Sequence, residues 1–151
     1  MKTESTRRRK PKVQRSSAKA YPSMPCPTER EESMKIMAWA RLMVATGQEP
    51  RLSLLRCGFE GIRLSMGVSM QMKRQSISIG WPDLFLSVPS FIHEPHDYYG
   101  LYIELKRLKG GIVSVDQRAM HDELEAQSYC VRVCRGADHT IQTIKDYLGM
   151  S

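Results

Sequence analysis

The stretch GLYIELKRLKGG, residues 100–111, combines the pattern of a buried β-strand with two opposite charges near its end. Side chains alternate between the faces of a strand, so Leu101, Ile103 and Leu105 form an apolar face. Glu104 and Lys106 share the opposite face, about 7 Å apart at ~3.4 Å of rise per residue. Such a pair is either a weak ion pair on a solvated strand face or part of a functional site, and the flanking segments decide between the two.

A second strand is predicted over DLFLSV, residues 83–88, after a turn that contains Gly80 and Pro82. A polar loop separates it from the strand in residues 101–106, so the two are expected to pair as an antiparallel hairpin. Antiparallel pairing brings the start of one strand beside the end of the next. We therefore predict that Asp83, Glu104 and Lys106 meet at one edge of a sheet.

The first helix is predicted from Thr28, which forms a capping box with Glu31, to the stop signals at Gly47 and Pro50. Apolar residues between positions 34 and 45 cover almost its whole circumference. A helix of this kind is buried on more than one side. It is either the central core helix of a monomer or part of a homodimer interface, which we place near Trp39 and Met43.

Further elements follow from the same signals. Strands are predicted over residues 51–57 and 129–134, and a Met-rich helix is expected after Gly61. Ser114 and Gln117 form a second capping box for a helix that reaches residue 127, and the last helix ends at Gly149. The order of elements predicts an α/β fold with one mixed β-sheet that is flanked by helices.

Length and charge divide the chain into two regions. The 151 residues suffice for one domain with a real core, and no run approaches the ~20 apolar residues of a membrane span. The whole excess charge of +7 lies in residues 1–20, which hold eight Lys or Arg and one acid (8 − 1 = +7). We predict a basic disordered tail, residues 1–27, and a domain, residues 28–151, in a cytoplasmic protein without a membrane partner.

The tail is suited to contacts with the phosphate backbone of nucleic acids. Its densest segment is RRRKPK, which contains Arg7, Arg8, Arg9 and Lys10. A solubilising tail or a sorting signal would have the same composition. Elsewhere, the four cysteines are expected to be buried reduced thiols, and the spacing of His93 and His96 is only weak evidence for zinc.

Two carboxylates and a lysine at one sheet edge have the composition of a Mg²⁺ or Mn²⁺ site. Such ions take oxygen ligands, keep several waters, and bind one or two carboxylates together with a substrate phosphate. The metal would activate a water molecule, and Lys106 would orient that water or neutralise charge on the phosphoryl oxygens. The predicted substrate is therefore a phosphodiester.

The set GWPDLFL, YIELKRLKGG and SxxQ, in this order, resembles the VRR-NUC domain of the PD-(D/E)xK nuclease superfamily over roughly residues 28–149. The resemblance implies a restriction-endonuclease-like fold. The small phage and bacterial members are homodimeric, metal-dependent endonucleases that cut branched DNA such as four-way junctions. The resemblance thus implies an endodeoxyribonuclease, with DNA as its partner and Mg²⁺ or Mn²⁺ as its cofactor.

The resemblance also implies roles for individual residues. Asp83 and Glu104 would bind the metal with the carbonyl of Leu105, and Lys106 would be the catalytic lysine. A glutamate of the first helix would complete the site. The candidates are Glu29, Glu31 and Glu32, of which we favour Glu32 because Glu31 has its capping role.

Two further segments match the family pattern in part. Gln117 is the glutamine of SxxQ, although its capping role explains the same spacing. In FEGIR, Arg63 matches a substrate-contacting arginine, but Phe59 stands where the family has asparagine. The alternatives to a nuclease are a catalytically inactive DNA-binding protein with the same fold and a protein–protein interaction module.

Overall fold

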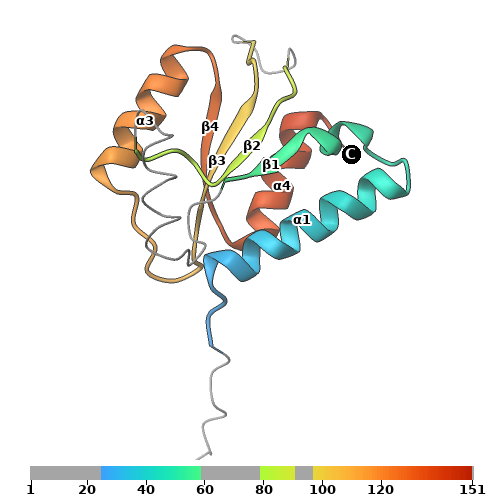
Figure 1. Cartoon of the computed structure of the whole chain (residues 1–151), viewed down its shortest axis with the longest axis horizontal. Coiled ribbons are helices and arrows are strands. Elements are labelled where there is room, and N and C mark those ends of the chain that lie inside the picture. Colours follow the sequence, from blue (N-terminus) through green and yellow to red (C-terminus); the bar gives the residue numbers. More distant parts are fainter. Residues whose placement is uncertain (1–24, 59–78, 91–96, 151) are drawn as a thin grey trace, which may run out of the picture.

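The computed structural model describes residues 25–58, 79–90 and 97–150 of the chain. The predicted Met-rich helix after Gly61 and the His93–His96 pair lie outside these residues. The described elements, in chain order, are α1 (Glu29–Ala45), the 3-10 helix η1 (Pro50–Leu54), β1 (Leu55–Cys57), β2 (Leu84–Leu86), β3 (Leu101–Lys106), α3 (Val115–Ala126), β4 (Cys130–Arg135) and α4 (Gly136–Leu148) (Figure 1).

The four strands form one mixed sheet in the order β1-β2-β3-β4. β2 pairs with both β1 and β3 in antiparallel orientation, and Leu84 lies opposite Ile103. β3 and β4 are parallel, with α3 as the crossover between them. The predicted antiparallel hairpin and the predicted α/β fold with a mixed, helix-flanked sheet are both confirmed.

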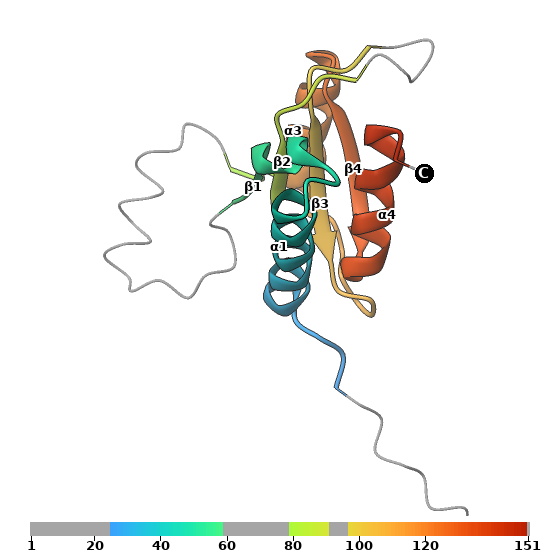
Figure 2. The same cartoon turned by 90° about the vertical axis from the view of Figure 1, so that its right-hand side faces the viewer.

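Helices cover the two faces of the sheet. Figures 1 and 2 show α1 and α4 on one face and α3 on the other. The main core lies between the sheet and the pair α1 and α4, and its fully buried members include Ile36, Leu84, Ile103 and Ile144. A smaller apolar cluster under α3 contains Met120, Leu124 and Val131 on the opposite face. Because side chains alternate between the two faces along β3, successive residues of this strand face α1 and α4 or face α3.

The first helix begins and ends where its sequence predicts. The side chain of Thr28 accepts from the backbone N–H of Glu31, and the Glu31 side chain accepts from the backbone N–H of Thr28. The helix ends at Ala45, and Gly47 has a left-handed φ of +70°. One side of the helix packs on the core through Ile36 and Ala40.

Apolar residues on the other side of α1 remain partly exposed. Met34 is 63% exposed and Leu42 is 61% exposed. Trp39 and Met43, by contrast, are partly buried against the main core of the same chain. Within the described part of the chain, the circumference of α1 is therefore not fully covered.

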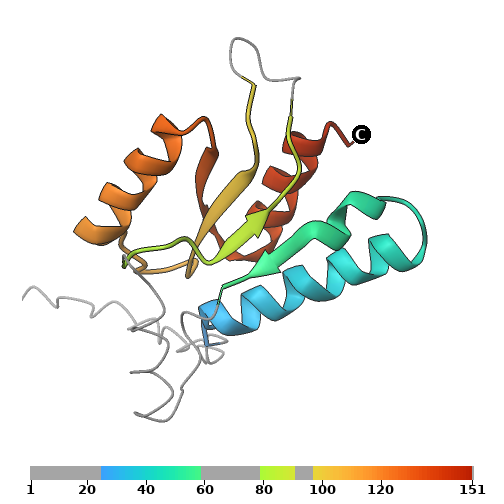
Figure 3. The ribbon, with the colours of Figure 1, turned by 45° about the horizontal axis from the view of Figure 1, so that its top comes forward.

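The prediction of a strand over residues 51–57 is wrong for its first half. Residues Pro50–Leu54 form η1, and only Leu55–Cys57 join the sheet (Figure 3). Pro50 fixes a helical φ at the start of this turn. The Glu49 carboxylate accepts from the backbone N–H of Arg51 at 3.2 Å and from its guanidinium at 2.6 Å and 2.7 Å. These contacts outweigh the alternating apolar pattern.

The predicted strand in residues 129–134 and the last helix are confirmed as β4 and α4. No loop separates them, because Gly136 has a left-handed φ of +72° that turns the chain directly into the helix. α4 ends at Gly149, which has φ +67°.

All four cysteines are free thiols, but only two fit the prediction of burial. Cys130 and Cys134 are buried in β4, whereas Cys57 is exposed and Cys26 is half-buried. No helix in residues 25–58, 79–90 and 97–150 is long and apolar enough to cross a membrane. The division into a tail, residues 1–27, and a domain, residues 28–151, stays a prediction.

Candidate functional site

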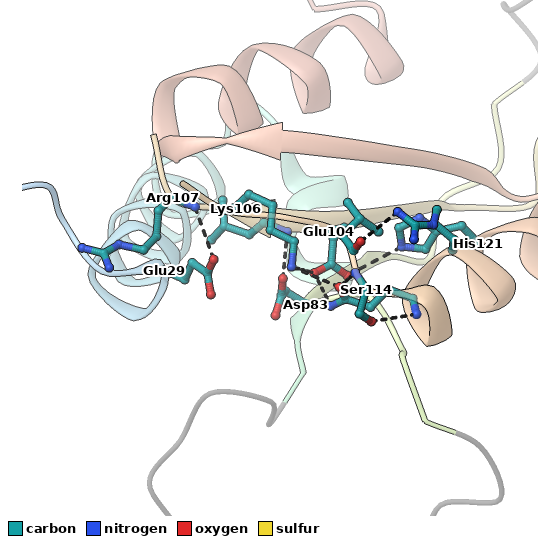
Figure 4. A network of polar contacts seen from close by, with 12 residues as sticks. Glu29, Asp83, Glu104, Lys106, Arg107, Ser114 and His121 are labelled. Atoms are coloured by element: carbon teal, nitrogen blue, oxygen red, sulfur yellow. Dashed lines mark hydrogen bonds and ion pairs between the residues drawn. The ribbon is translucent and has the colours of Figure 1, made fainter. Parts of the chain in front are cut away.

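The hairpin register places Asp83 at the end of β3. Leu84 pairs with Ile103, so Asp83 stands one position beyond this pair, beside Glu104. The backbone N–H of Leu105 donates to Asp83 Oδ2 at 2.8 Å (Figure 4). Glu104 is 1% exposed and Lys106 is 7% exposed, so these charges do not belong to a solvated strand face.

Three side chains form a closed set of contacts at this edge. Lys106 Nζ lies 2.7 Å from Glu104 Oε1. Gln117 Nε2 donates to the same oxygen at 2.6 Å, and Gln117 Oε1 accepts from Lys106 Nζ at 3.2 Å. The structure thus brings together five of the predicted site residues, namely Asp83, just before β2, Glu104, Leu105 and Lys106 on β3, and Gln117 on α3.

Gln117 also has the capping role that its spacing predicts. Its side-chain oxygen accepts from the backbone N–H of Ser114 at 2.9 Å, and its own N–H donates to Ser114 Oγ at 3.1 Å. The capping role of Gln117 is therefore confirmed, and its side chain also contacts Glu104 and Lys106, whereas a part in catalysis stays a prediction. The cap fixes the first turn of α3, which directs the amide toward Glu104.

The charged form of Asp83 is disfavoured at this position. Burial, together with the negative charge of Glu104, raises the pKa of Asp83 to about 7. The hydrogen bond from Leu105 and the charge of Lys106 oppose this shift without cancelling it. A divalent cation between the carboxylates would offset their electrostatic repulsion, since an adjacent opposite charge favours ionised carboxyl groups.

His121 joins the same group of contacts and was not predicted from the sequence. Its Nε2 lies 3.6 Å from Glu104 Oε2, and both residues are buried (Figure 4). The signal that could have revealed it is its spacing from Gln117. Residues four apart on a helix share a face, so a helix that directs Gln117 toward the strand also directs His121 there.

The structure does not place Glu32 in the site, contrary to our choice among the three glutamates. Glu32 is 3% exposed, and its Oε2 accepts from the backbone N–H of Ala137 at 2.9 Å and lies 3.5 Å from Lys35 Nζ. Glu32 therefore caps the N-terminus of α4, which has no side-chain cap from its own N-cap residue, Arg135.

Glu29 is the glutamate of α1 that borders the site. Its Oε1 accepts from the backbone N–H of Arg107 at 3.3 Å, and its negative charge adds to the causes that raise the pKa of Asp83. Glu31 is exposed and is engaged in the capping box with Thr28.

A cavity of about 630 Å³ opens at this edge of the sheet. The polar side chains described above form one wall of the cavity, and a face of α1 forms the other. The lining includes Glu29, Arg41, Asp83, Glu104, Lys106 and Gln117. The charged side chains of Asp83, Glu104 and Lys106 thus border a cavity instead of a closed core.

The donors in the cavity fit a hard divalent cation better than a soft one. Asp83 and Glu104 offer carboxylate oxygens, and Leu105 also lines the cavity. No three His, Cys, Asp or Glu side chains are gathered as a metal cage within the described ranges. Two carboxylates suit Mg²⁺ or Mn²⁺, whose remaining positions are filled by water and substrate oxygens, and not a structural Zn²⁺.

The predicted DNA-contacting residues lie outside the described part of the chain. They are Arg63, in FEGIR, and the tail residues Arg7, Arg8, Arg9 and Lys10. Their positions relative to the cavity stay predictions.

Comparisons with known proteins give one informative result. No family model matches the sequence, and no curated protein matches it. Among solved structures, a "VRR_NUC domain protein" is similar with a TM-score of 0.63 and 21% sequence identity. The similarity covers 84% of this chain and 93% of the other. The chain therefore has the fold of a VRR_NUC domain protein, which confirms the restriction-endonuclease-like fold that the sequence predicts.

Proposed function

We propose that the protein is a metal-dependent endonuclease that hydrolyses phosphodiester bonds in DNA. The observation that carries this proposal is the buried group of Asp83, Glu104 and Lys106, which opens into a cavity at the end of an antiparallel hairpin. A protein with no use for these charges would lose little by replacing them with apolar residues, since buried ion pairs contribute weakly to stability.

Each residue has a distinct part in this proposal. Asp83, Glu104 and the carbonyl of Leu105 would hold Mg²⁺ or Mn²⁺, with Glu29 at the margin. When bound, the metal supplies Lewis-acid stabilisation and an activated water. Lys106 would stabilise negative charge on the phosphoryl oxygens, since its ammonium group lies beside Glu104, one of the proposed metal ligands.

The proposed substrate is branched DNA, and the proposed acting form is a homodimer. The resemblance to small VRR-NUC nucleases supports both. The exposed Leu42 on α1 also supports an interface between two copies, because the described residues leave this apolar side chain largely uncovered. Two sites in such a dimer can act on two strands of one branch point.

A cleavage assay with a panel of labelled DNA substrates tests the proposal. The panel contains linear duplex, nicked duplex, flap, splayed arm and four-way junction, at one salt concentration, with Mg²⁺, Mn²⁺ or a chelator. Cleavage that requires metal is expected in the wild type and not in an Asp83→Asn, Glu104→Gln double variant. Binding of the panel without cleavage would instead favour the inactive DNA-binding protein.

A further inference from the structure

Two buried polar atoms in the described part of the chain have no hydrogen-bond partner, and they face each other. They are Glu104 Oε2 and His121 Nε2, which lie 3.6 Å apart. This distance is too long for a hydrogen bond. Buried polar groups in folded proteins are almost always satisfied, so a facing pair of unsatisfied atoms needs an explanation.

The other carboxylate oxygen of Glu104 already has two hydrogen-bond donors. Its Oε1 accepts from Lys106 Nζ at 2.7 Å and from Gln117 Nε2 at 2.6 Å. Oε2 is therefore the part of the carboxylate that retains free lone pairs, and it lies on the side of His121.

The position of His121 follows from the way α3 is built. The capping box of Ser114 and Gln117 fixes the first turn, and His121 stands four residues after Gln117 on the same face. Met120 and Leu124, on either side in the chain, anchor the helix to Val131 in the smaller apolar cluster. α3 thus directs one polar side chain toward each oxygen of the same carboxylate.

We propose that His121 is a positioning residue for Glu104. In this role the imidazole carries a proton on Nε2 and donates a hydrogen bond to Glu104 Oε2 after a small rotation of either side chain. With Gln117 on one oxygen and His121 on the other, the plane of the carboxylate is fixed for metal binding. This role rests on the proposed function, because it concerns Glu104 as a ligand. Groups that orient a metal ligand in this way are typical of metal sites.

A matched pair of variants separates hydrogen bonding from packing. Gln and Met are similar in length and shape, but only Gln offers an N–H donor. The full chain is compared as wild type, His121→Gln and His121→Met, with Met120→Leu as a control on the same helix. The measurement is the affinity for Mn²⁺ alone by titration calorimetry, without DNA.

We expect His121→Met to lose Mn²⁺ affinity by about 10–100-fold, the usual loss for such partners. His121→Gln is expected to recover most of that loss, and Met120→Leu to bind as the wild type does. A folded His121→Met protein with wild-type affinity would overturn the role. Failure of the wild type itself to bind Mn²⁺ would instead overturn the proposed function.

Nitrogen NMR of the imidazole in the wild-type protein tests the same contact without any variant. We expect Nε2 to carry a proton in the metal-free protein and to keep it when Mg²⁺ is added. An Nε2 without a proton in the metal-free protein cannot donate to Glu104, and loss of the proton on Mg²⁺ addition would make His121 a ligand. Either result overturns the proposal.

Discussion

Leu105 holds Asp83 in place through its backbone: its N–H donates a 2.8 Å hydrogen bond to Asp83 Oδ2. The donor belongs to the strand that carries Glu104 and Lys106 on either side of Leu105. The carboxylate before β2 is thereby tied to the two charges at the end of β3. Replacements in this group should consequently change both catalysis and stability.

Asp83→Asn should stabilise the metal-free protein, and more so at high pH. Folding raises the pKa of Asp83 from 3.8 to about 7, chiefly through burial and then through the charge of Glu104. A carboxyl group with a raised pKa favours the folded state only while it is protonated. Its contribution to the free energy of unfolding therefore falls as the pH rises from about 4 to about 7. The melting temperature of Asp83→Asn, relative to wild type in chelator, should be higher at about pH 8 than at about pH 5.

Added Mn²⁺ should raise the melting temperature of the wild type by more than that of Asp83→Asn. The wild type binds the ion more tightly as Asp83 loses its proton, because metal and proton compete for one carboxylate. Its melting temperature at about pH 8 should rise with Mn²⁺ by more than that of Asp83→Asn. An equal rise in both would show that Asp83 is not a ligand.

Lys106→Ala should lower the cleavage rate by about 10²–10³-fold, the usual effect of removing an electrostatic stabiliser of the transition state. It should also destabilise the metal-free protein by about 3–5 kcal/mol, since the buried Glu104 loses its cation. Urea unfolding in chelator measures the second effect. The double variant Lys106→Ala, Glu104→Gln is the control and should recover most of the stability, whereas no recovery would mean that Lys106 matters for packing alone.

Glu29→Gln and Glu32→Gln should have opposite effects, which tests the placement of the two glutamates. Glu32→Gln replaces a charged acceptor at the N-terminus of α4 and should cost about 1 kcal/mol in the free energy of unfolding, with Mn²⁺ affinity kept. Glu29→Gln removes a charge at the cavity and should weaken Mn²⁺ binding with little change in stability. Calorimetry and urea unfolding measure both. If Glu32→Gln weakened Mn²⁺ binding and Glu29→Gln lowered stability instead, Glu32 would be the metal-site glutamate.

Leu42→Arg should convert the proposed dimer to a monomer. Leu42 is 61% exposed on α1, so a charge there is tolerated in one chain but not at an apolar interface. Light scattering should give twice the chain mass of 17.3 kDa for the wild type and one chain mass for the variant. Met43→Arg is a poorer test because Met43 packs against the core of its own chain. A monomeric wild type would refute the dimer.

Deletion of residues 1–20 should weaken DNA binding at low salt and flatten its dependence on salt. Each phosphate contact that is lost lowers the log–log slope for duplex DNA by about 0.9. The cleavage rate at saturating protein should change little, because the cavity is built by other residues. A control with the eight basic residues of the segment replaced by Gln should behave as the deletion does. An unchanged slope would leave the tail with a solubilising or sorting role.

Local signals in the sequence account for most of the fold. The two capping boxes, the stop at Gly47 and the left-handed Gly149 each involve residues within a few positions of one another. Strand alternation and hairpin geometry likewise suffice to bring Asp83 to Glu104 and Lys106. η1 was missed because the fixed φ of Pro50 and the Glu49–Arg51 contact outweigh an alternating pattern that is otherwise typical of a strand.

The part of the site that the sequence did not reveal depends on packing between distant segments. Glu32 and Glu29 are both acidic residues in the first turns of α1, and only the docking of α4 separates their roles. His121 likewise acquires its position from the way α3 lies on β3. The sequence around Glu32 has no signal that distinguishes it from an ordinary surface glutamate. The spacing of His121 from Gln117 places both on one face of α3, but it does not show which strand that face contacts.

The hydrogen bond from Ala137 to Glu32 joins residues that are 105 positions apart. During synthesis on the ribosome, the first helix emerges long before the backbone that its buried glutamate contacts. β4, the parallel neighbour of β3, also appears late in the chain. The sheet edge that carries Asp83, Glu104 and Lys106 should therefore assemble only after α4 has left the exit tunnel.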